Sequence, residues 1–205
     1  MSESRPTIDM DALRQHSAEL IEHLRHTGAT PGLAVGEPAP PFSLPDPHGR
    51  SVSLAQRLES GPVVLVFYRG AWCPVCNNAF IGLQAALPRF TELGASLVAV
   101  SPQRPDDSLA FVQKLTLGFD VLSDASQETI RAYRLQFELS DELKGMYPAL
   151  GMDLTRQNAD GSWNLPVPAT FVIDQQQTIR AAHVDPDYRN RMVPDEIVAA
   201  LRALR

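Results

Sequence analysis

The chain has 205 residues, a formal net charge of −6 at pH 7 and only two cysteines. A chain of this length buries a core that needs no disulfides, so we expect one domain with an appendage. Hydrophobic residues make up 44% and charged residues 20% of the sequence, a composition that excludes a disordered chain. The acidic balance disfavours nucleic acid as a partner, and no apolar run approaches the roughly 18 residues of a membrane helix.

Both cysteines lie in a single Cys-x-x-Cys motif, Cys73 and Cys76. A secreted domain that depends on disulfides has its cysteines spread along the chain. The first 30 residues are polar and lack the apolar segment of a secretory signal. We therefore expect a reducing compartment, the cytoplasm.

Residues 9–27 are predicted to form a helix, because Asp9 or Asp11 can cap its start, apolar residues recur at helical spacing, and Gly28 can end it. Six of the 17 prolines follow between Pro31 and Pro47, which predicts a linker or an extended wrap. The apolar stripe of the helix can dock on its own domain or pair with a second copy. Both remain open, and of the two we favour a homodimer.

The rest of the chain alternates predicted strands with predicted helices. Continuous apolar runs indicate strands that are buried on both faces, and stripes of helical period separate them. This alternation predicts an α/β fold with a mostly parallel sheet and an antiparallel hairpin at one edge. The predicted strands are 63–68, 96–100, 119–122, 169–173 and 178–182, the predicted helices are 74–93, 106–117, 124–133 and 194–204, and 138–165 is ambiguous, with a possible helix over 142–150.

The cysteine motif lies between a predicted buried strand and a predicted helix, where α/β sheets place ligands. Cys73 falls near the helix N-cap, and Pro74 at the first helical position. The unpaired amides and the helix dipole favour a thiolate at Cys73, and Arg69 is close enough in sequence to add to the effect. Cys76 lies one helical turn on, where it can resolve a mixed disulfide or a sulfenic acid.

Two other interpretations of the cysteine pair are weaker. Half of a zinc site would require further ligands, but the chain has no second Cys-x-x-Cys and no histidine obviously paired with this one. An inert buried pair is the other alternative. Histidines 16, 23 and 26 share helical spacings, and a solvated face explains them better than a metal site does. We therefore expect no metal and no cofactor.

Trp72-Cys73-Pro74-Val75-Cys76 after a buried strand resembles thioredoxin. The surrounding strand ends, Val98–Pro102, Leu122–Asp124 and Ala169–Asp174, are similar to those of peroxiredoxins, the alkyl hydroperoxide reductase/thiol-specific antioxidant family. The resemblance is closest to a peroxiredoxin-like subgroup that carries Arg-Gly-x-Trp-Cys-Pro-x-Cys. It implies a thioredoxin-like fold, with a central mixed β-sheet flanked by helices, over residues 33–205. Residues 1–32 would add an N-terminal helix and a linker.

The peroxiredoxin resemblance places the family's peroxidatic cysteine on Cys76 and its threonine on Cys73. The family's proline falls on Arg69, and its distant arginine falls on Pro168. Loss of these groups disfavours efficient peroxidase activity. The thioredoxin resemblance instead predicts a cis Val167–Pro168 bond facing the disulfide. Trp163 and Tyr147 are interpreted as packing residues of the 138–165 segment rather than as pocket residues.

These observations support three hypotheses. The first is a thiol–disulfide oxidoreductase in which Cys73 attacks, Cys76 closes a redox-active disulfide, and Trp72, Pro74 and Pro168 shape the site. The second is an antioxidant, a thiol-dependent peroxidase that reduces hydroperoxides, with either cysteine oxidised first. The third is a non-enzymatic redox sensor. The two enzymes would require an external thiol reductant, thioredoxin-like or glutathione-like, which the sequence does not name.

Overall fold

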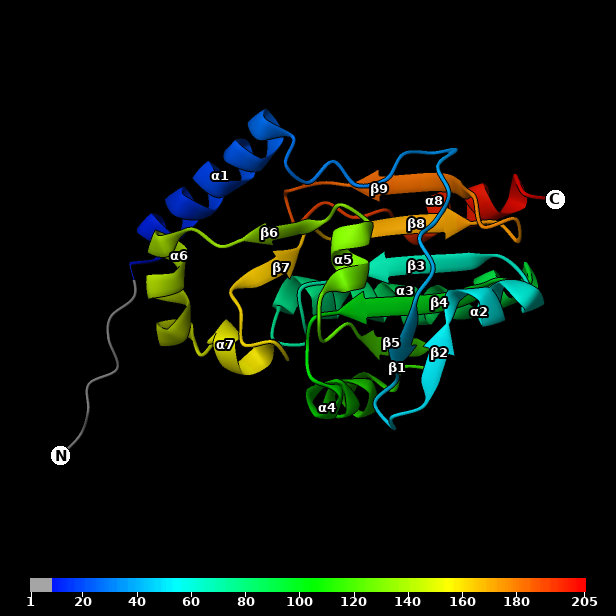
Figure 1. Cartoon of the computed structure of the whole chain (residues 1–205), viewed down its shortest axis with the longest axis horizontal. Coiled ribbons are helices and arrows are strands. Elements are labelled where there is room, and N and C mark those ends of the chain that lie inside the picture. The colour runs from blue at the N-terminus through cyan, green and yellow to red at the C-terminus, as the bar shows by residue number, and fades with distance from the viewer. Residues whose placement is uncertain (1–8) are drawn as a thin grey trace.

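A five-stranded mixed sheet forms the centre of the computed structural model, which describes residues 9–205 (Figure 1). The strand order is β5–β4–β3–β8–β9, in which β3, β4 and β5 are parallel and β8 is antiparallel to both β3 and β9. The sheet therefore confirms the predicted mixed architecture with its antiparallel edge. The strands are β3 Val63–Phe67, β4 Ser96–Ser101, β5 Asp120–Ser123, β8 Ala169–Ile173 and β9 Ile179–Val184.

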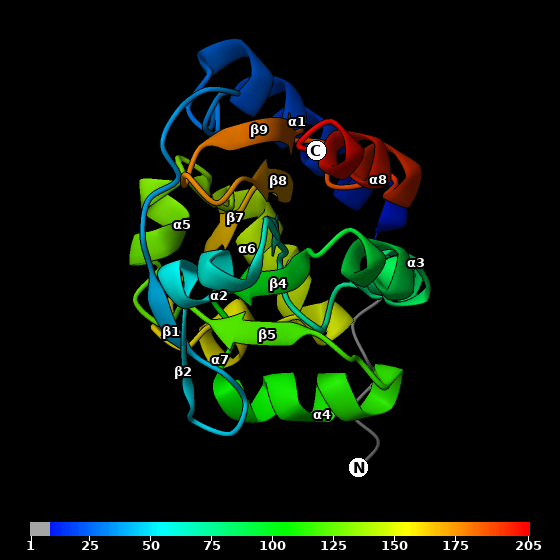
Figure 2. The ribbon, with the colours of Figure 1, turned by 90° about the vertical axis from the view of Figure 1, so that its right-hand side faces the viewer.

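Helices cover both faces of this sheet (Figure 2). Successive side chains of a strand point to opposite faces, and alternate residues of β3 accordingly belong to two different core clusters. Every residue of β3 and β8 is buried, which explains their continuous apolar sequence. The first cluster includes residues of α2 (Leu54–Ser60) and α5 (Glu128–Ala132), and the second includes residues of α3 (Pro74–Glu92), α4 (Pro105–Leu115) and α8 (Pro194–Arg202).

The predicted helices form close to their expected bounds, with one displaced start. Helix α5 begins at Glu128 rather than at residue 124, because Gln127 adopts a left-handed conformation with φ 57°. The buried Asp124 carboxylate still serves this helix, since it accepts a 2.8 Å hydrogen bond from the Ile130 amide. No helix within residues 9–205 is long and apolar enough to cross a membrane.

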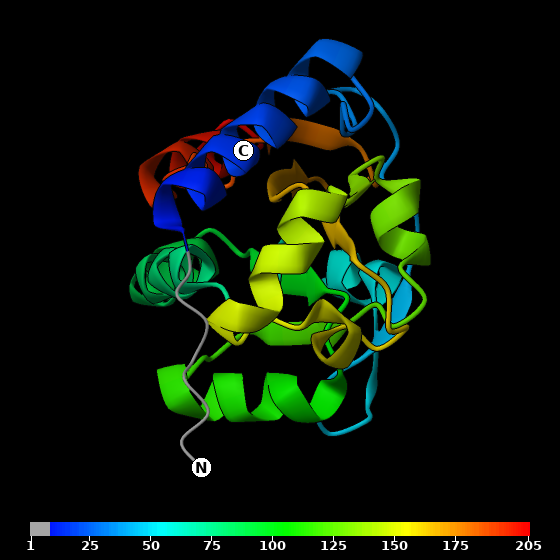
Figure 3. The same ribbon diagram turned by 90° about the vertical axis from the view of Figure 1, so that its left-hand side faces the viewer.

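The N-terminal helix α1, Met10–Thr27, forms as predicted. The Asp9 side chain accepts hydrogen bonds of 3.0 Å from two first-turn amides, and Gly28 ends the helix with φ 60°. Helix α1 packs against α6 (Asp141–Met146), and its Leu24 belongs to the first core cluster. Figure 3 shows the side of the molecule on which α1 lies. The apolar stripe therefore docks on its own chain, and a homodimer stays a prediction.

The proline-rich segment wraps along the sheet edge in an extended conformation. The Gly36 amide donates to the Ile179 carbonyl at 2.8 Å, and the Ala39 amide donates to the Gln177 carbonyl at 2.9 Å. A hairpin of β1 (Ser43–Pro45) and β2 (Ser51–Ser53) follows. Ser53 is both the last residue of β2 and the N-cap of α2. This arrangement confirms the predicted extended wrap.

The ambiguous segment folds into a small subdomain with its own apolar cluster, which includes Leu143, Tyr147 and Leu165. Trp72 of the cysteine loop packs against this cluster, so the segment borders the cysteines. Besides α6, its elements are β6 Gln136–Glu138, the 3-10 helix η1 Tyr147–Leu150, α7 Leu154–Gln157 and β7 Asn164–Pro166. The predicted helix over 142–150 is thus divided between α6 and η1.

Candidate active site

The cysteines occupy the turn between β3 and α3. Cys73 is the N-cap of α3, Pro74 is its first residue, and Cys76 completes the first turn, as the sequence predicts. Gly70 adopts φ 143°, and a Cβ atom there would collide with the Trp72 indole. The Ala71 amide donates a 2.6 Å hydrogen bond to the Gln103 side chain, which fixes the loop to the end of β4.

Both cysteines are free thiols and are almost completely buried. Cys73 is 2% exposed and Cys76 is 0% exposed. Both sulfurs belong to the second core cluster, on the buried side of the start of α3. A reaction partner therefore has to be small, or the loop has to open, before either sulfur is reached.

Electrostatics distinguish the two sulfurs. The pKa of Cys76 is lowered to about 5, chiefly by a hydrogen bond from the Cys73 thiol. Burial opposes this shift, and the positive charges of Arg191 and then Arg69 support it. Arg191 Nη2 lies 3.5 Å from Cys76 Sγ and donates to it. Cys76 is therefore the sulfur that these surroundings hold as a thiolate.

The pKa of Cys73 moves in the opposite direction. Its hydrogen bond to Cys76 and its burial both raise that pKa. The sequence predicts the thiolate at Cys73, from its place at the helix N-cap, and the structure differs. The reason is the hydrogen bond between the two thiols, in which Cys73 donates to Cys76, together with the positive charges of Arg191 and Arg69 beside Cys76. The helix terminus alone therefore does not decide the charge.

Arg69 is buried beside the cysteines, with 5% exposure. Its Nη2 donates a 2.7 Å hydrogen bond to the Tyr147 hydroxyl. Its guanidinium carbon lies 4.3 Å from the centre of the Tyr188 ring and 4.9 Å from that of Trp72, both within cation–π range. Arg69 thus joins the cysteine loop to two aromatic residues that are distant in the sequence.

A small cavity of about 20 Å³ lies beside Arg69. This is space for about one water molecule. Arg69, Tyr147, Pro168 and Tyr188 are among its lining residues, and α1 covers it with residues that include Ile21. Tyr147 therefore belongs to the site, contrary to its interpretation as packing alone, whereas Trp163 packs against the small apolar cluster.

Pro168 lies at the site, but the prediction of a cis bond before it is wrong. The part of the chain that the structure describes contains no cis peptide bond, so Val167–Pro168 is trans. The Val167 amide donates to the Leu135 carbonyl at 2.8 Å, which leads the chain into β8 in an extended conformation. This feature of the thioredoxin resemblance is absent.

Sequence reasoning missed Arg191, Tyr188 and Gln103. They come from connecting segments without periodic pattern, and Arg191 is separated from Cys76 by 115 residues. The resemblance to peroxiredoxins offers one weak signal for Arg191, because it implies an arginine at the position that Pro168 occupies and so points to a cation from elsewhere in the chain. Within residues 9–205, no group of three or more His, Cys, Asp or Glu side chains is placed to hold a metal ion.

Residues 35–182 match the AhpC/TSA family. A Mycobacterium tuberculosis protein with a provisional peroxiredoxin name is 35% identical over 153 residues, which cover 75% of this chain and 86% of that protein. Peroxiredoxin Bcp of Escherichia coli is 30% identical over 108 residues, which cover 53% of this chain and 69% of that protein. The chain belongs to the AhpC/TSA family.

The crystal structure of peroxidoxin BcpB from Mycobacterium tuberculosis superposes with a TM-score of 0.67 and 24% identity. It covers 84% of this chain and 99% of that chain. At this identity the likeness shows the fold alone, and it confirms the thioredoxin-like fold. The family match and the relatives make this protein a peroxiredoxin-like thiol-based oxidoreductase. The narrower subgroup with Arg-Gly-x-Trp-Cys-Pro-x-Cys stays a prediction.

Proposed function

We propose that this protein is a thiol peroxidase in which a hydroperoxide oxidises Cys76 and Cys73 then closes the disulfide. The observation that carries the proposal is the contact of Arg191 Nη2 with Cys76 Sγ at 3.5 Å. The lowered pKa of Cys76 makes it a thiolate at neutral pH, and a thiolate is the reactive form. The resemblance of the motif to peroxiredoxins supports the same residue, because it implies Cys76 as the peroxidatic cysteine.

The chemistry balances with the two cysteines and an external dithiol. The Cys76 thiolate attacks one peroxide oxygen, the O–O bond breaks, and the departing alkoxide takes a proton from solvent to leave as an alcohol. Cys76 is then a sulfenic acid. The Cys73 sulfur attacks Cys76, the S–S bond forms, and water leaves with the Cys73 proton. The external dithiol returns two electrons and two protons by exchange through a mixed disulfide.

Burial supports a hydroperoxide over a protein disulfide as the oxidant. A disulfide substrate must bring its own sulfur to within about 2 Å of the attacking sulfur for the new bond to form. Cys73 and Cys76 are 2% and 0% exposed, so a protein surface cannot approach them unless the loop opens. A small hydroperoxide needs much less room.

Thiol–disulfide exchange that starts at Cys73 is the second candidate. The position of Cys73 at the N-cap of α3, followed by Pro74, favours it because the helix N-terminus stabilises negative charge. In that order Cys73 attacks an external disulfide and Cys76 releases the product. Both candidates use the same couple, and they differ in which sulfur reacts first.

The remaining assignments also belong to the proposal. Residues 33–205 would form the redox domain, and residues 1–32, of which 1–8 lie outside the described part, would be its appendage. A thioredoxin-like or glutathione-like system would supply the reducing thiol. The protein would form a homodimer and act in the cytoplasm. The cytoplasmic location is supported by the two cysteines, which lie in one Cys-x-x-Cys motif rather than spread along the chain.

Rapid-mixing kinetics with hydrogen peroxide and with an alkyl hydroperoxide tests the proposal on wild type, Cys73→Ser and Cys76→Ser. We expect Cys73→Ser to keep fast oxidation and to accumulate a sulfenic acid at Cys76, identified by mass spectrometry after trapping. Cys76→Ser should lose the fast phase. If Cys76→Ser reacted as fast as wild type, Cys73 would be the attacked sulfur. Wild-type oxidation no faster than that of a free thiol would exclude a peroxidase.

A further inference from the structure

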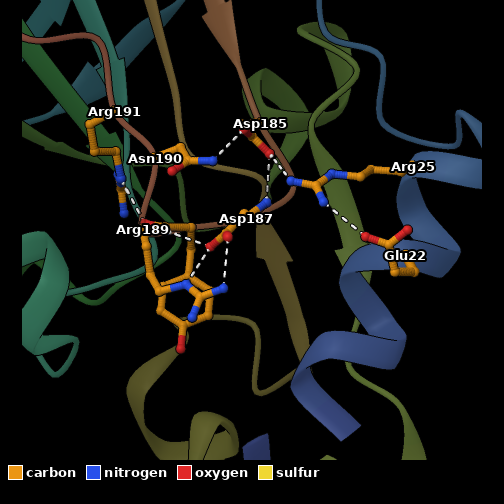
Figure 4. A network of polar contacts seen from close by, with 8 residues as sticks. Glu22, Arg25, Asp185, Asp187, Arg189, Asn190 and Arg191 are labelled. Atoms are coloured by element: carbon orange, nitrogen blue, oxygen red, sulfur yellow. Dashed lines mark hydrogen bonds and ion pairs between the residues drawn. The ribbon is translucent and has the colours of Figure 1, made fainter. Parts of the chain in front are cut away.

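The segment after β9, residues 185–191, forms a compact polar loop that carries Arg191 (Figure 4). We refer to it as the 185–191 loop. The Asp185 carboxylate accepts hydrogen bonds of 2.8 Å from the Asp187 amide and from the Asn190 side chain. The Asp187 carboxylate pairs with the Arg189 guanidinium through two hydrogen bonds of 2.7 Å. The loop therefore has a conformation defined by its own side chains.

Arg191 is held at both ends of its guanidinium. Its Nε donates a 2.8 Å hydrogen bond to the Tyr188 carbonyl, and its Nη2 donates to Cys76 Sγ at 3.5 Å. None of the ion pairs among residues 9–205 involves Arg191. The Cys76 sulfur is thus the anionic partner available to this cation.

The 185–191 loop is also fastened to the N-terminal helix. Arg25 of α1 pairs with Asp185 at 3.1 Å and with Glu22 of its own helix at 2.8 Å (Figure 4). Asp185 is the residue that organises the loop, so α1 contacts the loop at the point on which its internal hydrogen bonds converge. This gives the added helix a structural connection to the cysteine site.

Arg191 also faces a cleft of about 270 Å³ between α3 and the segment that leads into α8. Apolar residues such as Val75, Phe80 and Met192 line most of this cleft. The same side chain therefore touches the Cys76 sulfur and borders space large enough for a small molecule. A guanidinium in this position can donate to the thiolate and to an oxygen atom that approaches it.

We infer that Arg191 is a catalytic residue, which stabilises the Cys76 thiolate and donates to the approaching peroxide oxygen, and that α1 positions it through the Arg25–Asp185 pair. This inference rests on the proposed role of Cys76. It also gives α1 a role as a positioning element.

The groups that face Cys76 are Cys73 of the N-cap, Arg69 of the preceding loop, Tyr68 at the end of β3, and Arg191. Burial raises the pKa of the Tyr68 hydroxyl, so this group stays neutral through the range of interest. Replacing Cys73 with serine removes the second thiol and keeps a hydroxyl donor. In that background, a titration of thiolate absorbance reports on Cys76 alone and requires no reagent to enter the buried site.

The test measures the midpoint pH of Cys76 ionisation in Cys73→Ser, with and without Arg191→Met. We expect the midpoint to rise by about 1 pH unit or more in Arg191→Met, because a positive charge at this distance favours the ionised form of Cys76. Arg191→Lys should give an intermediate midpoint, since it keeps the charge but not both hydrogen bonds. Far-ultraviolet circular dichroism checks that each variant is folded. If Arg191→Met does not fold, Arg191→Lys still tests the inference.

Arg25→Gln should raise the midpoint by a smaller amount, a few tenths of a pH unit, because the Arg25–Asp185 pair is partly exposed. Arg14→Gln serves as the matched control, because it removes a cation of the same helix that pairs only with Asp11 of that helix. It should not move the midpoint.

An unchanged midpoint in both Arg191→Met and Arg191→Lys would overturn the role of Arg191. A shift with Arg191→Met but none with Arg25→Gln would overturn the role of α1. The titration uses no peroxide, so it separates this inference from the proposed function. If the Cys76 midpoint shifts as expected but peroxide oxidises the wild type slowly, the peroxidase alone is rejected. If oxidation is fast but the midpoint does not shift when Arg191 is replaced, the Arg191 inference alone is rejected.

Discussion

Two arginines approach the cysteine pair, and they differ in what they contact. Arg69 directly precedes the motif in sequence, yet its guanidinium bonds to Tyr147 and lies against the rings of Trp72 and Tyr188. Arg191 is 115 residues from Cys76, and its guanidinium donates to the sulfur itself. Arg69 mainly connects the cysteine loop to the aromatic residues around it, whereas Arg191 stabilises the thiolate of Cys76. Proximity in sequence therefore does not show which guanidinium contacts the sulfur directly.

The difference should be largest in the pH dependence of stability. The folded-state pKa of Cys76 is about 5, below the roughly 8.5 of an unfolded cysteine. Its contribution to the free energy of unfolding is then complete above pH 8.5 and is lost as the pH falls to 5, with a slope of up to about 1.4 kcal/mol per pH unit. Urea unfolding of Cys73→Ser, referenced to Cys73→Ser/Cys76→Ser, measures this contribution. Arg191→Met should flatten the dependence more than Arg69→Met does, and equal flattening would contradict the distinction.

Below that pH window, the order of the two arginines should reverse. At pH 4.5 Cys76 is mostly a thiol, so Arg191→Met should lower the free energy of unfolding by less than about 0.5 kcal/mol. Arg69→Met should still lower it by about 2 kcal/mol, because it removes a hydrogen bond to Tyr147 and contacts with two aromatic rings. Denaturant unfolding at this pH makes the comparison. A larger loss with Arg191→Met would show that Arg191 holds the fold rather than the thiolate.

Tyr147→Phe removes only the hydroxyl that accepts from Arg69, which is a smaller change. We expect a loss of about 1 kcal/mol in the free energy of unfolding, since the buried guanidinium loses one partner. The ionisation midpoint of Cys76 should stay where it is, because the Arg191 contact is untouched. Unfolding and thiolate titration on the same variant check both expectations. A shifted midpoint would show that the Arg69 side controls the thiolate.

The sequence predicts the parts of this molecule that have a repeating pattern. The apolar runs of β3, β4 and β8 identify the buried strands, and Pro74 beside Cys73 identifies the start of α3. The location of the redox couple follows from these elements alone. Helix α1 is predictable for the same reason, from its cap and its apolar spacing.

The polar surroundings of the couple could not be predicted in this way. Tyr147 and Arg191 reach the site from irregular segments through single long-range contacts, and such contacts leave no period in the sequence. The cis bond expected at Pro168 came from one element of a resemblance, and the extended backbone that leads into β8 is trans. Which sulfur carries the charge depends on the hydrogen bond between the two thiols and on the unpredicted Arg191.

The most direct test of the account is the thiolate titration of two single variants, Cys73→Ser and Cys76→Ser. Each variant retains one sulfur, so the absorbance midpoint belongs to one residue. We expect a midpoint well below the ordinary cysteine pKa in Cys73→Ser, where Cys76 remains, and one no lower than the ordinary value in Cys76→Ser, where burial still opposes a thiolate at Cys73. A low midpoint in Cys76→Ser together with an ordinary or raised one in Cys73→Ser would place the thiolate on Cys73 and contradict it.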